Sequence, residues 1–318
     1  MSPLGVAPVV APGIEATIGE TPLVDVSVLS PNPAVRILAK LESDNPTGSI
    51  KDRTALALIE AAERAGDIHP GDTILEPTSG NTGISLAMLC RLRGYTLRAV
   101  MPENVTPERR ALLSLYGAEI ISSPAETGSN GSVEMARDLA ARQGVYMPFQ
   151  YGNPANPDAH YFGTAAEIVR DCPEIDVLVA GLGTGGTLMG SARRLREHRA
   201  DTRIVAAEPL QGDPVSGLRS LDDGFIPPIL DVGQLDGKRL VSNRDSVIMT
   251  RRLASEAGVF AGVSSGGVFH VASRVAESMD EGTVVGIVCD GGWKYLSAGI
   301  WTDDLDAVED DLERRLTW

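Results

Sequence analysis

Residues 45–53 read Asn45-Pro46-Thr47-Gly48-Ser49-Ile50-Lys51-Asp52-Arg53, which sets one of only four lysines behind a Pro-Thr-Gly-Ser turn. The next residues, 54–65, are largely apolar at their start and predict a helix. A lysine at the buried start of a helix loses hydration and lies near the positive end of the helix dipole, and both effects lower the pKa of its amine. Because a neutral amine attacks aldehydes to form imines, Lys51 is a candidate for covalent catalysis.

Two runs of small polar residues each follow a predicted strand and precede a predicted helix. The first is Thr78-Ser79-Gly80-Asn81-Thr82-Gly83, and the second is Gly181-Leu182-Gly183-Thr184-Gly185-Gly186-Thr187. Backbone N–H groups at such helix starts bind anions. The first run would therefore accept a carboxylate or phosphate, although composition alone favours an ordinary N-cap made by Ser or Asn. The second is placed as a phosphate cradle.

The second run also fits a dinucleotide-binding fingerprint. Gly181, Gly183 and Gly186 match the pattern GxGxxG, and Glu208 closes the following predicted strand, where a ribose-binding acid would lie. From these residues alone, a nicotinamide cofactor stays a serious alternative.

A fourth run, Gly262-Val263-Ser264-Ser265-Gly266-Gly267, lies between a short apolar segment and a helix predicted over 268–279. A serine hydroxyl here could meet a ring nitrogen of a ligand. A capped helix start is the simpler explanation of this run taken by itself.

Short apolar segments alternate with helical patterns along the chain, which predicts an α/β fold with parallel sheets covered by helices. Strands are expected at 35–41, 73–76, 97–101, 119–122, 177–180, 203–207 and 284–288. Helices are expected at 54–65, 82–93, 107–116, 133–142, 159–171, 188–198, 245–257, 268–279 and 305–316. Residues 209–237 show little periodicity and predict a long loop, of a length that is usually functional or mobile.

Composition excludes several classes of partner. With 43 acidic and 28 basic residues, the net charge of -15 disfavours nucleic acid and anionic membranes. No secretory signal or apolar run of about 18 residues is visible, so we expect a cytoplasmic protein without a membrane span. Cys90, Cys172 and Cys289 are far apart in sequence, which predicts reduced thiols and neither a metal site nor a disulfide scaffold.

Taken together and in this order, these runs resemble the fold-type II pyridoxal phosphate enzymes, specifically the cysteine synthase family. The resemblance extends from about Thr17 to Tyr295 and includes the segment Phe149-Gln150-Tyr151-Gly152-Asn153-Pro154-Ala155-Asn156. It favours pyridoxal 5'-phosphate over a nicotinamide cofactor. It implies two lobes, each with a central, mostly parallel sheet flanked by helices. The larger, phosphate-binding lobe would comprise 1–42 and 152–318, and the smaller, substrate-carboxylate-binding lobe 43–151.

The resemblance also implies roles for single residues. Lys51 would hold the cofactor as a Schiff base and later take the α-proton, and Asn81 would bond the ring hydroxyl oxygen. Ser264 would bond the pyridine nitrogen, with Ser265 as the second choice. The cofactor phosphate would be held by Gly183, Thr184, Gly185, Gly186 and Thr187. The substrate carboxylate would be held by Thr78, Ser79, Thr82 and Gln150.

The serine partner has a chemical consequence. A neutral hydroxyl cannot keep the pyridine nitrogen protonated, so the ring is a weaker electron sink than one paired with a carboxylate. This favours β-elimination to an α-aminoacrylate over transamination. Addition of a sulfur nucleophile would then give L-cysteine.

Within this family, the chain resembles the actinobacterial branch that uses O-phospho-L-serine. The shared features are Asp222-Asp223-Gly224-Phe225 behind Arg219, and Asp290-Gly291-Gly292-Trp293-Lys294-Tyr295-Leu296-Ser297. The resemblance implies that Arg219 binds the substrate phosphate, which suits the bidentate geometry of a guanidinium.

The resemblance to this branch also implies a sulfur donor, and it leaves one alternative for the reaction open. Sulfur would arrive as the C-terminal thiocarboxylate of a small carrier protein, and residues 312–318 could enter the cleft as a plug. The family implies a homodimer. An O-acetylserine sulfhydrylase that uses free sulfide is the alternative.

Overall fold

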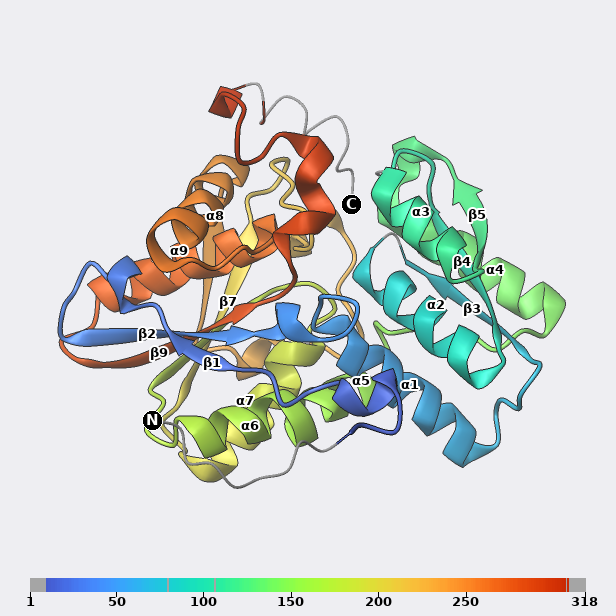
Figure 1. Cartoon of the computed structure of the whole chain (residues 1–318), viewed down its shortest axis with the longest axis horizontal. Helices are drawn as coiled ribbons and strands as arrows, with labels where there is room; N and C mark the ends of the chain where they lie inside the picture. The colour runs from blue at the N-terminus through green and yellow to red at the C-terminus, as the bar shows by residue number, and fades with distance from the viewer. Residues whose placement is uncertain (1–9, 79, 106, 307, 309–318) are drawn as a thin grey trace.

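The computed structural model describes residues 10–78, 80–105, 107–306 and 308, which form two lobes with separate sheets (Figure 1). The larger sheet has the order β1-β2-β9-β6-β7-β8, and the smaller one has the order β3-β4-β5. The larger sheet consists of β1 (Leu23–Asp25), β2 (Val35–Leu41), β6 (Val177–Gly181), β7 (Arg203–Pro209), β8 (Gly237–Val241) and β9 (Gly282–Val288). The smaller sheet consists of β3 (Thr73–Pro77), β4 (Thr96–Pro102) and β5 (Glu119–Ser123).

All neighbouring strands run parallel except β1, which pairs antiparallel with β2. The longer helices are α1 (Lys51–Ala65), α2 (Asn81–Arg93), α3 (Pro107–Leu115), α4 (Gly128–Gln143), α7 (Gly186–His198), α8 (Asn243–Ala257) and α9 (Val263–Glu277). Two short helices, α5 (Ala155–Ala159) and α6 (Ala165–Asp171), flank a π-helical turn at His160–Thr164. The two-lobed α/β architecture that the resemblance implied is confirmed.

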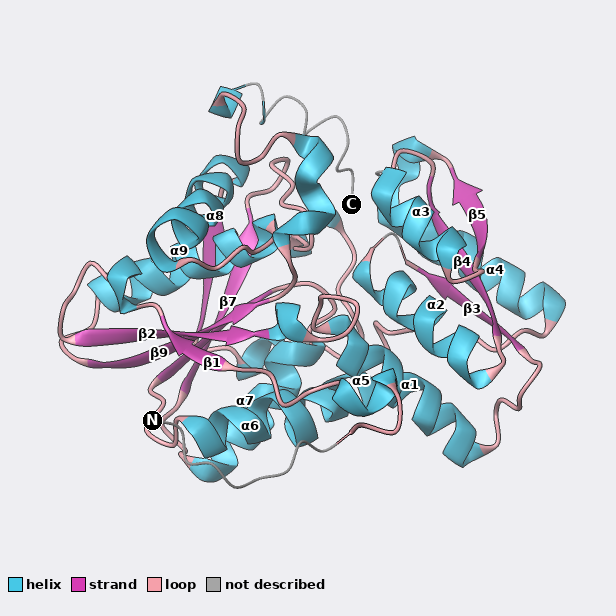
Figure 2. Cartoon of the chain, in the orientation of Figure 1, coloured by secondary structure: helices cyan, strands magenta, loops and turns pink. Residues whose placement is uncertain are grey.

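Both faces of the larger sheet are covered, because successive residues of its strands enter different cores. Val177 and Val179 of β6 pack with α8 and α9, whereas Leu178 and Ala180 pack with α6 and α7. Figure 1 shows these helix pairs on opposite faces of the sheet, and Figure 2 shows the two groups of strands apart from each other, one in each lobe. This two-sided burial explains why the strands read as continuous apolar runs.

The seven predicted strands are confirmed, but the edge strands β1 and β8 were missed. In β8, Lys238, Arg239 and Leu240 are exposed, so no apolar run marks the strand. The helix predicted over 159–171 is interrupted by the π-helical turn. The helix predicted over 305–316 lies mostly outside the described residues.

Several helices begin earlier than predicted, since their first turns contain Gly, Ser and Asn, which propensity disfavours in helices. In α9 the cause is tertiary packing. A Cβ on Gly266 would lie 2.0 Å from the carbonyl oxygen of Ser246 on α8. The two glycines after Ser265 therefore belong to the helix and allow α8 and α9 to approach closely.

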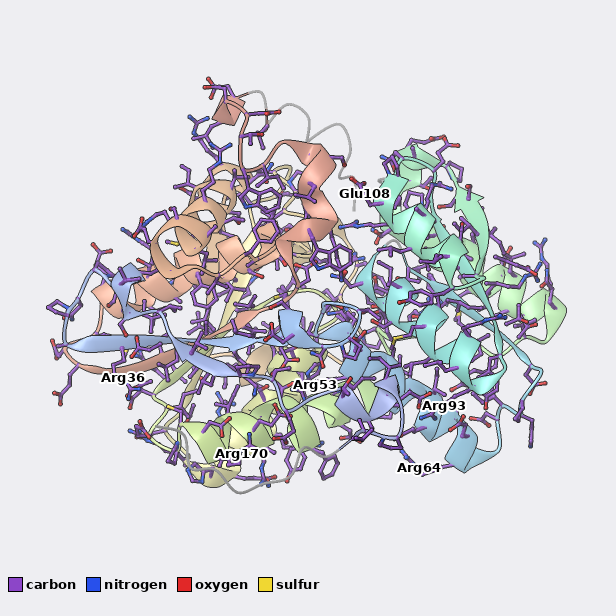
Figure 3. All side chains as sticks on the ribbon, in the orientation of Figure 1. Arg36, Arg53, Arg64, Arg93, Glu108 and Arg170 are labelled. Carbon is purple, nitrogen blue, oxygen red and sulfur yellow. The ribbon has the colours of Figure 1, made fainter. Side chains whose placement is uncertain are left out.

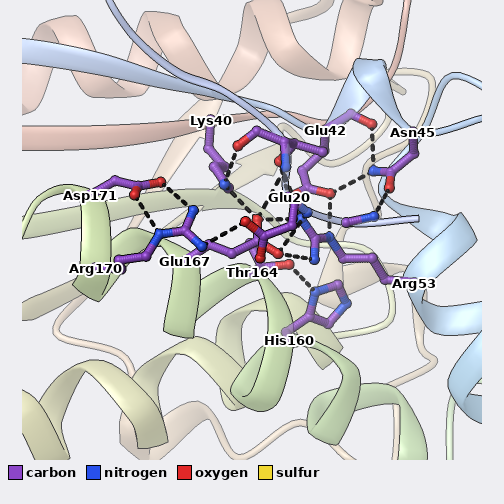
Figure 4. Close-up of polar contacts among 12 residues, drawn as sticks. Glu20, Lys40, Glu42, Asn45, Arg53, His160, Thr164, Glu167, Arg170 and Asp171 are labelled. Atoms are coloured by element: carbon purple, nitrogen blue, oxygen red, sulfur yellow. Dashed lines mark hydrogen bonds and ion pairs between the residues drawn. The ribbon is translucent and has the colours of Figure 1, made fainter. Parts of the chain in front are cut away.

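A buried ionic cluster joins α1 to the larger lobe (Figure 4). Arg53 donates to both carboxylate oxygens of Glu167 at 2.6 and 2.7 Å and to Glu42 at 2.7 Å. The Lys40 ammonium donates to Glu167 at 2.7 Å. Two cations and two carboxylates balance each other in this cluster. By contrast, Arg36 and Arg64 lie at the outside of the molecule (Figure 3).

Candidate active site

An open pocket of about 890 Å³ lies where segments of both lobes meet. It collects most of the residues that the sequence singled out. Its walls include Lys51, Thr78, Asn81, Thr82, Gln150, Gly183, Thr184, Gly185, Thr187, Arg219 and Ser264. Ser79 lies outside the described residues. Gly186 stands behind the wall, because a Cβ there would lie 1.9 Å from Oδ1 of Asn156.

Lys51 is the first residue of α1, and the turn before it is fixed to the end of β9. The backbone N–H of Ile50 donates to the carbonyl of Cys289 at 2.9 Å. Gly48 has a φ of 75° and packs so closely under the Trp293 ring that a Cβ would lie 3.0 Å from it. Burial lowers the pKa of the Lys51 amine, and the nearby Cys289 and Asp290 offset this only in part. A neutral amine is thus accessible at the pocket wall.

The glycine loop forms the N-terminus of α7, where Gly185 adopts a left-handed φ of 89°. The side chain of Asn156 braces the loop. Its Nδ2 donates to Oγ1 of Thr184 at 2.9 Å and to the carbonyl of Gln150 at 2.8 Å. A Cβ at Gly183 would make only an ordinary contact of 3.5 Å, so packing does not demand glycine there. Short residues at this helix start leave room for an anion beside backbone N–H groups and two threonine hydroxyls.

Glu208 does not serve the ribose role that the dinucleotide alternative requires. Its carboxylate accepts the N–H of Leu221 at 2.7 Å and pairs with Lys238 at 2.7 Å, and Glu208 is not part of the pocket wall. The dinucleotide interpretation of the GxGxxG match therefore lacks its ribose-binding acid.

The two serines at the start of α9 differ in their surroundings. Ser264 is 2% exposed and lines the pocket. The hydroxyl of Ser265 instead accepts the backbone N–H of Cys289 at 2.9 Å. The geometry thus favours Ser264 over Ser265 as the partner of a ligand atom, while Ser265 holds the strand end.

Two of the expected carboxylate-binding residues, Thr82 and Gln150, are hydrogen-bonded to each other, and Thr78 bonds the same helix start. Oγ1 of Thr82 donates to Oε1 of Gln150 at 2.7 Å, and Oγ1 of Thr78 accepts the N–H of Gly83 at 2.9 Å. Gln150 is positioned by Glu76, which the sequence did not single out. The Glu76 carboxylate accepts the backbone N–H groups of Phe149 and Gln150 at 2.8 and 3.0 Å. These bonds hold Phe149 at a φ of 53°, which is unusual for a bulky residue.

Glu76 should make the stability of the fold depend on pH. Burial raises the pKa of this carboxyl from 4.5 to about 7, against the effect of its two N–H donors. Between these values the native state binds a proton that the unfolded state has lost, so stability falls as the pH rises through this range, by up to roughly 3 kcal/mol.

We therefore expect the free energy of unfolding of the wild type, relative to Glu76→Gln, to decrease between about pH 5 and pH 8. Urea unfolding at several pH values measures this difference. Glu119→Gln, on the exposed side of β5, should retain the wild-type dependence. Parallel curves for wild type and Glu76→Gln would contradict the assignment.

Three residues near Asn81 had been noted in the sequence only as part of the run 290–297 shared with the family branch, without roles of their own. Asp290 and Lys294 both bond the amide of Asn81, and the Tyr295 hydroxyl donates to Asp290 at 2.8 Å. Burial lowers the pKa of Lys294 to about 8, with partial compensation from Asp290 and Asp52. The resemblance of the run 290–297 to the family branch was the one sequence signal that pointed to these three residues.

The pocket fits pyridoxal phosphate by its set of donors. One wall offers a desolvated amine at Lys51, a second offers a glycine-lined helix start, and Ser264 supplies a buried hydroxyl. An aldehyde, a phosphate and a ring nitrogen match these three groups. Among the described side chains, no group of three or more His, Cys, Asp or Glu could hold a metal ion. None of the described helices has both the length and the apolar character needed to cross a bilayer.

Comparisons with known proteins agree with this fit. The family model described as "Pyridoxal-phosphate dependent enzyme" matches residues 14–290. Cysteine synthase B of Escherichia coli (strain K12) is 40% identical over 292 residues, covering 92% of this chain and 96% of the relative. Cysteine synthase of Staphylococcus aureus (strain N315) is 41% identical over 301 residues, covering 92% of this chain and 97% of the relative.

Solved structures are similar to this chain over nearly its whole length. O-ureido-L-serine synthase superposes with a TM-score of 0.87 at 38% identity, covering 93% of this chain and 97% of that chain. Cysteine synthase of Entamoeba histolytica gives a TM-score of 0.87 at 31% identity, with 98% of each chain covered. With this identity over nearly its whole length, the chain belongs to the cysteine synthase family of pyridoxal-phosphate-dependent enzymes.

Proposed function

We propose that this cysteine synthase takes O-phospho-L-serine as its amino-acid substrate. The observation behind the proposal is the state of Arg219, which is 5% exposed and lines the pocket. Its Nη1 donates to Oδ1 of Asn130 at 2.9 Å, whereas Nη2 is buried without a hydrogen-bond partner among the described residues. Within the described part of the chain, Arg219 forms no ion pair. A buried cation without a counter-charge is unfavourable, and a phosphate dianion would supply the missing partner.

Two aromatic rings hold the Arg219 guanidinium in place. Its central carbon lies 5.4 Å from the ring centre of Tyr151 and 5.0 Å from that of Phe225. Contacts of this kind stabilise a cation and restrict its rotation. The group is therefore held ready at the pocket wall before any ligand arrives.

The remaining residues have roles that their positions support. Pyridoxal phosphate, when bound, withdraws electrons from Cα of the amino acid, so that the β-substituent can leave. Nζ of Lys51 takes the proton from Cα. Thr82 and Gln150 orient the substrate carboxylate, and Arg219 neutralises the phosphate as its bond to Cβ breaks. A sulfur nucleophile then adds at Cβ, and Lys51 returns the proton to Cα.

O-acetyl-L-serine with free sulfide is the second candidate substrate pair. A related structure from Helicobacter pylori, 34% identical with a TM-score of 0.86 and covering 92% of this chain and 99% of that chain, is named an O-acetylserine-dependent cystathionine beta-synthase. An acetyl group is uncharged, however, and would leave the Arg219 guanidinium without a counter-charge.

The substitution Arg219→Met separates the two substrates. It keeps apolar volume between the rings of Tyr151 and Phe225 but removes the charge and its donors. We expect kcat/KM for O-phospho-L-serine to fall by about a hundredfold, in line with the loss of charge-assisted bonds, and that for O-acetyl-L-serine to change by less than about threefold.

Steady-state kinetics with both substrates, each with sulfide as the acceptor, measures this difference. Arg239→Met, at an exposed position of β8, is the matched control and should leave both values unchanged. Equal losses for both substrates would remove Arg219 from this role. A wild type that forms cysteine only from O-acetyl-L-serine would favour the second candidate.

The sulfur donor that the resemblance implies is the C-terminal thiocarboxylate of a small carrier protein. Comparing cysteine formation from such a carrier and from sulfide tests it, since a faster reaction with sulfide would argue against the carrier. The homodimer stays a prediction, and the proposed plug at 312–318 lies outside the described residues.

A further inference from the structure

The side-chain amide of Asn81 is held at both of its polar atoms. Its Nδ2 donates to Oδ2 of Asp290 at 2.8 Å, and its Oδ1 accepts from Nζ of Lys294 at 2.7 Å. Asn81 begins α2, whereas Asp290 and Lys294 follow β9. The contact therefore joins the two lobes at the pocket wall.

These two neighbours determine which way the amide faces. In the reversed orientation the NH₂ group would meet the Lys294 ammonium and the oxygen would meet the Asp290 carboxylate. Lysine has only donors and an ionised carboxylate only acceptors, so both bonds would be lost and replaced by repulsion. With one Nδ2 hydrogen on Asp290 and Lys294 on Oδ1, the donor that Asn81 has left for an acceptor atom of a ligand is its second Nδ2 hydrogen.

The side chain of Lys294 is held in one position by burial and by several contacts. The side chain is 1% exposed, and Nζ also donates to the carbonyl of Gly48 at 3.2 Å. Its ammonium lies 5.2 Å from the ring centre of Trp293. Asp290 is fully buried and accepts from Tyr295 as well as from Asn81. Buried, bonded groups of this kind have little freedom to reorient.

We propose that Lys294 is a positioning residue that keeps the amide N–H of Asn81 directed at an acceptor oxygen of the bound cofactor, the ring hydroxyl oxygen of pyridoxal phosphate. The proposal depends on the binding of pyridoxal phosphate and is independent of the choice between O-phospho-L-serine and O-acetyl-L-serine. Lys294 acts through Asn81 and does not touch the cofactor, since Asn81 lines the pocket and Lys294 does not.

The test is a double-mutant cycle on cofactor affinity. Lys294→Met keeps the length of the side chain but removes the donor to Oδ1 of Asn81, so that only the bond to Asp290 still holds the amide in its orientation. Titrating cofactor-free protein with pyridoxal phosphate should show a Kd about tenfold weaker than that of the wild type. In an Asn81→Ala background, the same substitution should weaken binding by less than about twofold. The absorption spectrum of the bound cofactor should change with Lys294→Met only when Asn81 is present.

If Lys294 only stabilised the fold, the double-mutant cycle would give a different result. Equal losses in both backgrounds, or no loss beside an intact Asn81, would overturn the proposal. The turn at Gly48 keeps a bond in the variant, because the N–H of Gly291 also donates to its carbonyl at 3.1 Å. Thermal unfolding shows whether each variant is folded. If Lys294→Met fails to fold, Lys294→Leu replaces it in the same double-mutant cycle.

Discussion

Lys51→Ala is expected to abolish covalent attachment of pyridoxal phosphate and to lower kcat by at least about a thousandfold. Among the described residues, Lys51 is the only lysine on the pocket wall. Burial lowers the pKa of its amine, which provides the neutral form that attacks an aldehyde. The substitution removes both the covalent anchor and the base that serves Cα.

Borohydride reduction followed by peptide mass spectrometry shows which lysine holds the cofactor. Lys238→Ala is the control, because Lys238 pairs with Glu208 away from the pocket and should change neither attachment nor turnover. Cofactor found on another lysine of the wild type would refute the assignment. Lys294 is the lysine to inspect first, since it lies one hydrogen bond from the pocket wall.

Glu167→Ala is expected to lower the free energy of unfolding by roughly 3–5 kcal/mol, because it leaves two buried cations without their shared counter-charge. Lys40 is fully buried and Arg53 is 6% exposed. Burial alone would raise the pKa of Glu167, but bonds and charges from Arg53 and Lys40 outweigh this and lower the pKa to about 2. Urea unfolding near neutral pH measures the loss.

The same substitution has a distinct pH signature. A carboxylate with a lowered pKa stabilises the fold above its ordinary value of 4.5, and this contribution disappears as the pH falls toward 2. The gap between wild type and Glu167→Ala should therefore narrow in acid. Arg170→Ala, in an exposed ion pair with Glu20, is the control and should leave the unfolding midpoint nearly unchanged. A neutral-pH effect as small as that of Arg170→Ala would contradict the role of the cluster.

Features that depend on neighbouring residues could be predicted from the sequence, whereas features that depend on tertiary packing could not. The central strands were predictable because burial on both faces leaves an apolar run in consecutive residues. The edge strand β8 was not, since its exposed Lys238 and Arg239 resemble those of a loop. The late predicted start of α9 has a similar origin, because Gly266 is helical only where α8 packs against it.

The amino-acid sequence by itself determined the reactive groups and their order along the chain. The Lys51 turn, the run containing Asn81, the glycine loop at 183–187 and Ser264 each combine a few neighbouring residues whose chemistry is local. The family resemblance that this series carries implied the fold class and the cofactor, and family comparison supports both.

Only the tertiary structure decided which side chains support those groups. Lys294 reaches Asn81 across 213 residues, Glu76 reaches Phe149 across 73, and Arg219 reaches Asn130 across 89. No local pattern encodes such pairs, because the path of the backbone brings them together and burial then strengthens their bonds. Thus the residues around Lys51 indicated the chemistry from the sequence alone. The orientation of Asn81, and the lack of a counter-charge at Arg219 among the described residues, became visible only in the folded chain.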